Sequence, residues 1–386
     1  MKLFEKKLNK TTVGNFEFIS DNQNGFYAYD GQLYQSDLIR SSIRPIVSAV
    51  GKSVSKHIFE QVKDGVKDIQ VNPQTYIRFL LEEPNPYMTG QLLQEKLTTQ
   101  LLLNNNAFAF IQRNDNGLPI AIYPIVAYNC EAIKSNGELF MTFYLKRNDA
   151  NSIVTFRYTD LIHLRRDFNE NEIFGSSPAT TLVPLMEIVT TTDQGIVKAI
   201  KNSNMVNWLL KYNSQLKDEH LTKSVKTFID NFLSNSSETV GAIGADAKFD
   251  VTQIKPNDYV PNASQMDRTK ERIYSFFNTN EKIVQSKFNE DEWISFYESC
   301  VEPIILQLSN EYTRKIFTRK ERMDGNYIMF EASNLGYAST QTKLAFMGMV
   351  DRGAMVPNEW RKLFNWAPID GGDEPIRRLD TRPITE

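Results

Sequence analysis

Apolar residues recur at helical spacing in the first third of the chain. Between Asp37 and Glu60 they fall three and four positions apart, which predicts one helix with Ser41 or Ser42 as its cap. The same spacing predicts a short helix over Thr75–Leu81 and an amphipathic helix over Thr89–Leu103, whose apolar stripe consists of Leu92, Leu93, Leu97 and Leu101. Prolines follow the short helix and end it, because a residue before proline avoids helical backbone angles.

Polar segments lie before and between these helices. Residues 1–36 are polar and contain several Asn and Gly residues, so we expect a weakly ordered arm with at most one hairpin. Residues 64–73 have no sustained apolar pattern and predict a loop.

Short segments of high β-propensity follow the amphipathic helix. Asn-Gly pairs lie between several of them, and such pairs are the strongest local signal for a hairpin. The segments predict strands at 107–113, 119–124, 126–133, 139–146, 152–158 and 160–166. We therefore expect one antiparallel sheet across residues 107–165, packed on the preceding helices.

Two helical segments flank a compact insert between residues 170 and 280. The first begins at Gly175-Ser176-Ser177-Pro178, where a serine suits the cap and proline suits the first turn, and runs to about Asn202. The second covers about 264–278. The insert between them, about 206–255, predicts strands at 206–211, 240–243 and 249–254 and a helix at 221–233.

The first of these helices has low intrinsic helix propensity in its middle. Three consecutive threonines, 190–192, and Gly195 each lower the propensity by a few tenths to about 1 kcal/mol. Because tertiary packing supplies most helix stability, this helix needs neighbours along its length. The small residues would let those neighbours approach closely.

The last third of the chain predicts mainly helices. A polar loop, Asn280–Glu290, leads into a long helix, Glu292–Phe317, which Pro303 should kink. The basic stretch from Arg314 to Arg322 predicts a solvated or subunit-facing surface. A strand at 327–330, helices at 339–351 and 357–364, and a loose tail from Ala367 complete the chain.

Composition narrows the class of protein. The chain has 386 residues, 41% of them hydrophobic, and a net charge of −3, which argues against a protein that grips nucleic acid by bulk charge. Cys130 and Cys300 are far apart, and with no export signal we expect isolated thiols. No apolar run approaches the ~20 residues of a membrane span, so we expect a soluble intracellular protein or assembly component without membrane contact.

Motifs that could carry catalysis or cofactor binding fit poorly. Gly51-Lys52-Ser53 resembles the end of a phosphate loop, but Ile46 stands where that motif needs its first glycine. Gly175–Ala179 resembles a nucleophile elbow, but its sequence fits a capped helix start better. The three histidines, His57, His163 and His220, show no metal-ligand spacing, and His163 suits a structural hydrogen bond. Glu290-Asp291-Glu292 suits a helix N-terminus. We therefore expect no catalytic residues, cofactor or metal.

The order of several motifs resembles the portal proteins of long-tailed double-stranded DNA bacteriophages, over roughly residues 37–365. The motifs are Pro84-Asn85-Pro86, Leu101–Phe110, Asn116-Gly117-Leu118-Pro119 before Ile122-Tyr123-Pro124, Asp160–Leu164, Phe174–Pro178, and a Pro303 helix after Phe276-Phe277. The chain departs from the family at Asn105, where glycine is frequent, and at 280–284, where a Val-Pro-Pro-like turn is frequent.

The resemblance implies an α+β portal fold that assembles as a ring. It maps onto this chain as an N-terminal arm (1–36), a wing of helices and antiparallel sheet (37–175), a first stem helix (176–203), a clip (204–258), a second stem helix (259–280), a channel loop with a long kinked helix (281–318), and a wing return with a small crown and C-terminal tail (319–386).

The resemblance also implies a function. It predicts a dodecameric ring at one capsid vertex of the virion, assembled in the host bacterial cytoplasm, that conducts DNA during packaging and ejection. The implied partners are other copies of the chain, the terminase large subunit, a head–tail adaptor, the major capsid and scaffold proteins, and DNA that passes without sequence recognition. The candidate DNA-channel loop residues are Gln285, Ser286, Lys287, Asn289, Glu290 and Asp291.

Two alternatives belong to other classes. The chain could be another structural protein of the phage head–tail junction, or, with less support, a nucleic-acid-processing enzyme. The few histidines and the lack of clustered acids outside a helix start speak against the enzyme.

Overall fold

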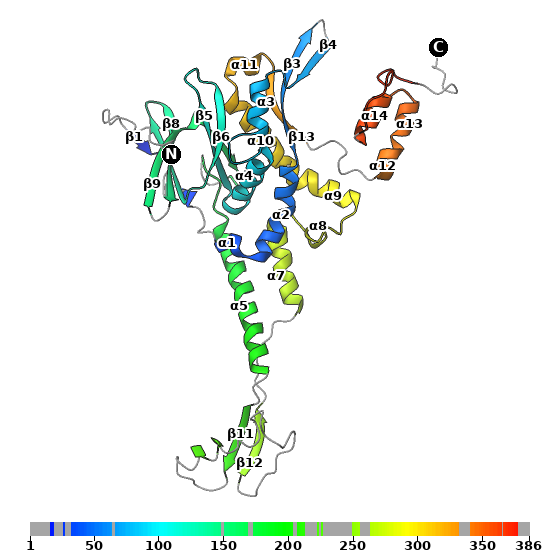
Figure 1. Cartoon of the computed structure of the whole chain (residues 1–386). Helices are drawn as coiled ribbons and strands as arrows, with labels where there is room; N and C mark the ends of the chain where they lie inside the picture. The colour runs from blue at the N-terminus through cyan, green and yellow to red at the C-terminus, as the bar shows by residue number, and fades with distance from the viewer. Residues whose placement is uncertain are drawn as a thin grey trace. The chain divides into compact units, whose positions relative to one another are not determined.

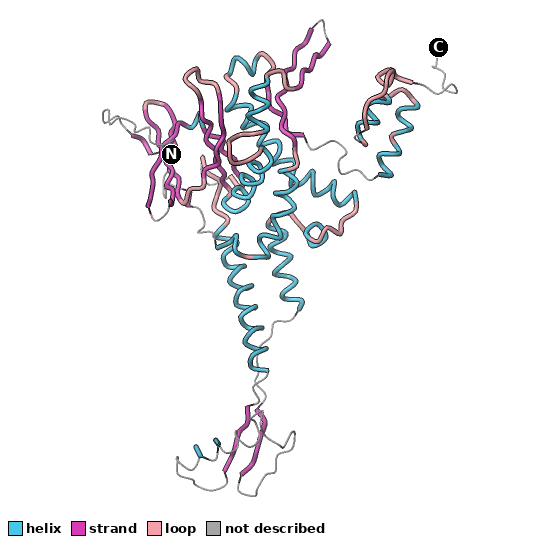
Figure 2. The backbone as a smooth tube through the Cα atoms, in the orientation of Figure 1, coloured by secondary structure: helices cyan, strands magenta, loops and turns pink. Residues whose placement is uncertain are grey.

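The computed structural model divides the chain into two compact units, Met1–Val183 with Lys270–Glu386 (unit 1) and Pro184–Thr269 (unit 2). Figures 1 and 2 show the elements of each unit. The structure describes residues 16–18, 26–27, 32–63, 66–147, 150–168, 173–203, 207–212, 222–223, 225–226, 249–254, 263–331, 340–364 and 366–376.

The first predicted helix is shorter than expected. After α1 (Gln32–Gln35), α2 covers Asp37–Gly51, and the Ser36 side chain caps it by accepting from the N–H of Ile39. The candidate caps Ser41 and Ser42 lie inside the helix instead, where both hydroxyls donate to the carbonyl of Leu38.

The predicted helix up to Glu60 is wrong from Val54 onward, and the predicted loop at 64–73 is wrong for residues 66–71. Two strands stand there, β3 (Val54–Lys63) and β4 (Val66–Val71), and together with β13 (Asn326–Glu331) they form a sheet of order β13-β3-β4. Val54 and Ile58 fit both a spacing of four and strand alternation. The pairing with β13, far away in the sequence, decides for strand.

The next two helices agree with their predictions. α3 covers Thr75–Glu82, and α4 covers Gly90–Asn104 with Thr89 as its cap. Of the predicted apolar stripe, Leu93, Leu97 and Leu101 are buried, but Leu92 is half exposed. Gly90, Gln94 and Thr98 are buried as well, so α4 has contacts on more than one side.

The predicted single sheet is two sheets. β5 (Asn106–Arg113), β6 (Pro119–Ile125) and β10 (Leu161–Arg165) pair in the order β10-β5-β6. The second sheet has the order β1-β7-β8-β9, with β2 also paired to β7; its strands are β1 (Phe16–Phe18), β2 (Phe26–Tyr27), β7 (Asn129–Ser135), β8 (Glu138–Arg147) and β9 (Ala150–Arg157). The two described strands of the arm, β1 and β2, therefore both pair with β7.

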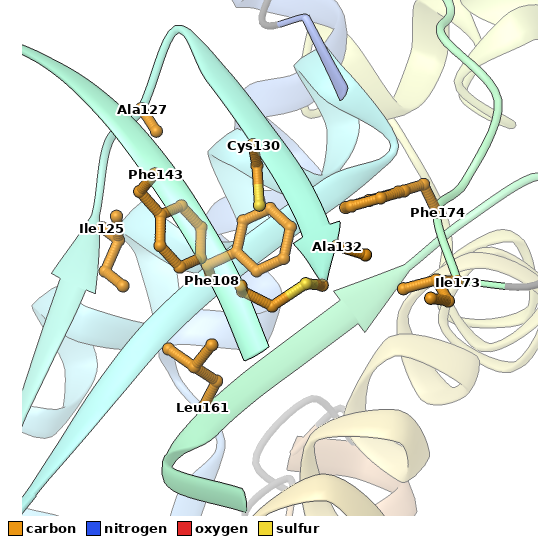
Figure 3. Close-up of a cluster of buried hydrophobic side chains, with 10 residues drawn as sticks. Phe108, Ile125, Ala127, Cys130, Ala132, Phe143, Leu161, Ile173 and Phe174 are labelled. Carbon is orange, nitrogen blue, oxygen red and sulfur yellow. The ribbon is translucent and has the colours of Figure 1, made fainter. Parts of the chain in front are cut away.

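An apolar core fills the space where the two sheets meet. Phe108 of β5 and Phe143 of β8 pack edge to face with ring centroids 5.0 Å apart, and both side chains are buried. Figure 3 shows how residues from both sheets converge on this pair; the cluster comprises Phe108, Ile125, Ala127, Cys130, Ala132, Met141, Phe143, Leu161, Ile173 and Phe174. The Cys130 thiol is free, as expected, and burial raises its pKa well above the ordinary value.

The long C-terminal helix is present but irregular. It consists of α9 (Glu290–Phe296), a π-helical turn η3 (Tyr297–Val301) and α10 (Glu302–Ile316), so it begins at Glu290 and not at Glu292. Pro303 lies in the first turn of α10. The irregularity therefore precedes the proline, because the proline ring would clash with the carbonyl four residues earlier in a regular helix.

Side chains of α10 form hydrogen bonds with the outward-facing backbone groups of two edge strands, β10 and β13, one in each sheet that α10 contacts. The Gln307 amide donates to the carbonyl of Arg165 (2.8 Å) and accepts from the N–H of the same residue (3.0 Å), at the edge strand β10. At the edge strand β13, Thr313 Oγ1 accepts from the N–H of Ile328 (2.8 Å) and Ser309 Oγ accepts from that of Phe330 (3.1 Å).

The helices and strands of the predicted stem and insert are partly described. α5 covers Ala179–Ser203 and α7 covers Ala263–Phe276, and both cross the boundary between the units. β11 (Asn207–Tyr212) pairs antiparallel with β12 (Phe249–Ile254). Residues 222–223 and 225–226 of the predicted helix 221–233 are helical, and the predicted strand 240–243 lies outside the described residues.

The C-terminal helices are α11 (Arg319–Met323), α12 (Thr340–Ala345), α13 (Met347–Asp351) and α14 (Pro357–Leu363), so two short helices replace the single one predicted at 339–351. Part of the tail predicted to be loose is held in place. Asn358 of α14 donates to the carbonyl of Ile369 and to Asp373. Trp360, Phe364 and Trp366 pack together as rings.

The closure of β10 by Gln307 can be tested by substitution. Gln307→Leu keeps the volume and removes both hydrogen bonds, so we expect the free energy of unfolding in urea to fall by about 1–2 kcal/mol. The control Gln91→Leu changes an exposed glutamine that bonds only to Glu95. It should change stability by less than about 0.5 kcal/mol. Equal effects of the two substitutions would contradict the role of Gln307.

Candidate functional site

The residues before α5 pack against the end of α4. Asn105, which follows α4, has a left-handed backbone with φ 53°, the conformation that favours glycine or asparagine at a helix end. Its side-chain amide donates to the carbonyl of Ser176 (2.7 Å) and to the carboxylate of Asp167 (3.0 Å). The departure from glycine at this position is therefore compatible with the required backbone, and the asparagine side chain adds two contacts.

Gly175 is enclosed by backbone. Asn106 of β5 donates through its amide nitrogen to the Gly175 carbonyl (2.9 Å) and accepts from the Gly175 N–H (2.9 Å). A Cβ at this position would lie 2.2 Å from the carbonyl oxygen of Arg166 and 2.4 Å from that of Asn105. Only glycine fits, so this residue fixes the path of the chain into α5.

The predicted helix start lies directly before α5. Ser177 Oγ accepts from the N–H of Ala179 (3.3 Å), and the Pro178 carbonyl accepts from that of Leu182 (2.9 Å). The helix begins at Ala179, so Ser177 satisfies one of its first N–H groups and the motif acts as a helix start.

A buried histidine extends this hydrogen-bond network. His163 of β10 lies between Asn106 Oδ1 (3.2 Å from Nε2) and the hydroxyl of Tyr158 (3.3 Å from Nδ1), and its ring stacks on Phe108 with centroids 4.3 Å apart. Burial, with a contribution from the Arg165 charge, lowers its pKa well below the ordinary value. The imidazole is therefore neutral, and the predicted structural hydrogen bond is confirmed.

Lys315 links the same network to α10. Its ammonium group donates to the carbonyl of Tyr158 and lies 3.8 Å from the centre of that ring, and burial lowers its pKa to about 8. Arg113 donates to the carbonyl of Lys315 (2.6 Å) and pairs with Asp160 (2.9 Å). The expectation of a solvated basic stretch is thus wrong for Lys315, because Tyr158 lies next to it from a distant part of the sequence.

The candidate channel loop lies between α8 (Glu281–Val284) and α9. Asn280 caps α8 by accepting from the N–H of Ile283 (3.0 Å), so the first part of the predicted polar loop, Asn280–Glu290, is helical. At the other end, Asn289 and Glu292 form a reciprocal capping box that starts α9. Lys282 forms an ion pair with Glu292 and joins the two short helices.

The six candidate loop residues therefore differ in role. Gln285 bonds to Glu281 (2.6 Å), Asn289 caps α9, and Glu290 and Asp291 belong to the first turn of α9. Ser286 and Lys287 are exposed in the loop itself, and Ser286 has a left-handed backbone with φ 58°. Of these six candidates, Glu290 and Asp291 are thus helical, and Gln285–Asn289 connect α8 to α9.

A cavity of about 180 Å³ lies beside the π-helical turn. Leu101 and Leu102 of α4, Arg165, Arg166 and Asn278, and Ser299, Cys300, Pro303, Ile304 and Gln307 line it. The Cys300 thiol is free, approaches the carbonyl of Phe277 (3.5 Å), and has a pKa raised to about 11 by burial. It therefore remains a thiol near neutral pH and is not a reactive nucleophile.

The described part of the chain contains neither a cluster of metal ligands nor a membrane-spanning helix. No group of three or more His, Cys, Asp or Glu residues in the described ranges is arranged to hold a metal ion. None of the described helices is long and apolar enough to cross a membrane.

Two glycines provide a matched test of the stem start. Gly175→Ala should destabilise the protein by at least about 2 kcal/mol, because the added Cβ meets two backbone carbonyls. Gly195→Ala adds a Cβ with nothing within 4 Å in α5 and should stabilise the chain by about 0.5–1 kcal/mol. Thermal unfolding of both variants checks the opposite signs, and a neutral Gly175→Ala would contradict the enclosure.

The buried imidazole predicts sensitivity to acid. Because the pKa of His163 is lowered in the folded state, the unfolded chain takes up a proton first as pH falls below about 6.5, and stability decreases. His163→Gln removes this group, so the stability advantage of wild type over the variant should shrink between about pH 7.5 and pH 5, by at most about 1.4 kcal/mol per pH unit. Urea unfolding across this range measures it. A constant difference would show that His163 does not titrate as argued.

Comparison with known proteins identifies the family. The family model described as phage portal protein matches residues 38–365. The portal protein of Enterobacteria phage HK97 is 22% identical over 324 residues, which cover 80% of this chain and 74% of that protein.

Solved structures share the fold. A chain in the neck of an empty GTA particle, computed with C6 symmetry, has a TM-score of 0.65 at 12% identity and covers 87% of this chain and 92% of its own. A chain in the neck of a native GTA particle, computed with C12 symmetry, has a TM-score of 0.61 at 11% identity, with coverage of 89% and 96%. Because the family model spans most of the sequence, this chain belongs to the phage portal protein family.

Proposed function

We propose that this chain is a portal subunit that assembles with copies of itself into a ring, dodecameric as the resemblance implies, at one capsid vertex of the virion. The family match over residues 38–365 carries the proposal. The similar chains in particle necks computed with C6 and C12 symmetry support a cyclic arrangement. The match also favours a portal over the alternative of another head–tail structural protein.

The surface of α5 supports assembly. This helix has 25 residues, yet Ile188 and Val197 are about half exposed and the space beside Gly195 is open. A helix with an uncovered apolar surface and a low intrinsic propensity gains stability from packing against neighbours. Adjacent stem helices of a ring would supply that packing, with 176–203 and 259–280 as stem helices and 204–258 as clip.

The ring would serve as a DNA conduit. The channel loop offers one cation, Lys287, and the exposed hydroxyl of Ser286, and the chain has a net charge of −3. Few phosphate contacts let DNA slide, because each neutralised phosphate strengthens binding. This chemistry suits passage of DNA without sequence recognition during packaging and ejection. The ring itself would assemble in the host cytoplasm.

The remaining roles fall to partners. The portal family is structural and not enzymatic, so the proposed ring performs no catalysis and needs no cofactor. A terminase large subunit would supply the ATPase and dock on the clip, and a head–tail adaptor would bind after packaging. Contacts with the major capsid and scaffold proteins would nucleate the procapsid.

Reversing the loop charge tests the conduit. Lys287→Glu places a carboxylate where DNA phosphates would pass, so we expect normal rings but packaged DNA reduced at least about ten-fold, through like-charge repulsion. Asn289 is left unchanged because it caps α9. The measurement is nuclease-protected DNA per particle in a packaging assay.

The control variant is Lys134→Glu, which reverses an exposed lysine on β7. It should package as wild type does. Normal packaging by Lys287→Glu would overturn the proposal that this loop meets DNA in the channel. Protein that stays monomeric at all concentrations tested by light scattering and electron microscopy would overturn the ring itself.

A further inference from the structure

The two sheets that contact α10 have four edges, and this chain covers three of them itself. Gln307 covers β10, and Ser309 and Thr313 cover β13. The edge of β6 is covered at Ile122, whose N–H donates to the Pro84 carbonyl (2.7 Å) and whose carbonyl accepts from the Asn85 amide (2.7 Å). Covering an edge prevents it from pairing with another chain.

The fourth edge, β4, is open. Within the described part of the chain the backbone of β4 is paired with β3 alone, from Ile58–Val71 to Lys63–Val66. In an antiparallel strand, alternate residues direct their N–H and carbonyl groups away from the paired neighbour. Figure 1 shows the β3–β4 hairpin extending beyond the helices next to it in unit 1.

One face of this hairpin is apolar and electrically balanced. Val71 pairs with Ile58 and Ile69 pairs with Glu60, while Val62 lies two residues after Glu60 on β3. Because side chains alternate between the two faces of a strand, Val62, Ile69 and Val71 lie on the same face. Their side chains are 55%, 54% and 68% exposed. The charged neighbours on this face are paired, Lys67 with Glu60 at 2.7 Å. Such a face suits an apolar protein surface and offers nucleic acid no free cation.

We propose that the β3–β4 hairpin is a contact between subunits, and that its occupant is a second copy of this chain, seated against β4 and the face formed by Val62, Ile69 and Val71. The inference rests on the proposed ring. A neighbouring copy supplies both partners that β4 lacks, strand or side-chain hydrogen-bond groups for the edge and apolar side chains for the face.

Cyclic symmetry supports this choice of occupant. A ring requires two different, complementary surfaces on each subunit, because its contacts are head to tail. The outer strand of the other sheet, β9, also pairs with only one strand, β8, in the described residues, and Ile153 on it is exposed. The chain thus offers a second open edge, on a different sheet, for the opposite side of the contact.

The test compares two isoleucines on edge strands. Ile69→Lys places a charge on the proposed contact, and Ile120→Lys is the matched control, since Ile120 is 52% exposed on β6, whose edge is covered. Light scattering and electron microscopy would measure the concentration at which half of the protein forms rings. We expect Ile69→Lys to raise it at least about ten-fold and Ile120→Lys to leave it within about two-fold.

Hydrogen exchange provides a second readout without substitution. Amides on the outer side of β4 should exchange more slowly in rings than in diluted, monomeric wild type, while the β6 amides should not change. Rings that form equally well with Ile69→Lys, or unchanged exchange in β4, would overturn the hairpin contact and leave the ring intact. Wild type that forms no rings would instead overturn the proposed function.

Discussion

The fold depends on satisfying the backbone groups at the edges of its sheets, and α10 satisfies two edges at once. Ser309 and Thr313 are four residues apart and therefore lie on one face of the helix, toward β13. Gln307 is two residues, about 200°, from Ser309 and lies on the opposite face, toward β10. A helix between two sheets can close both only if polar side chains stand at these positions. An apolar α10 would pack as well but would leave buried donors and acceptors without partners.

This closure explains where the long helix is irregular. Three side chains fix the register of α10 against two strands, so α10 cannot rotate to accommodate Pro303. The strain falls on the preceding residues, and η3 takes up one extra residue per turn between Tyr297 and Val301. Because α10 is held in place, the position of α9 is fixed through η3. The loop with Ser286 and Lys287, which ends at α9, is therefore anchored at that end.

Sequence patterns predicted what local physics determines. The Asn-Gly turns and the prolines that end the short helix after residue 81 all act within a few residues, and the structure agrees with each. The helix expected up to Glu60 failed because Val54 and Ile58 satisfy two periodicities, and a strand near residue 328 decides between them. The contacts of Lys315 with Tyr158 and of His163 with Asn106 join positions far apart in sequence, so no local pattern could reveal them. Two sequence signals did point to the hydrogen bonds before α5: the Gly175–Pro178 helix start, and Asn105 directly after α4, because asparagine is common at that position of a helix end.

Two glycines show how one residue type serves opposite needs in the same segment. Gly175 is required because backbone from two other segments occupies the place of a side chain, and it thereby fixes the direction in which the stem helix starts. Gly195 faces open space, and in a single chain it only weakens the helix. In the proposed ring, neighbouring subunits would supply the packing partners that this part of α5 lacks among the described residues. The proposed assembly accounts for the unfavourable propensity of α5, because a neighbouring subunit could approach closely a helix that has no side chain at Gly195.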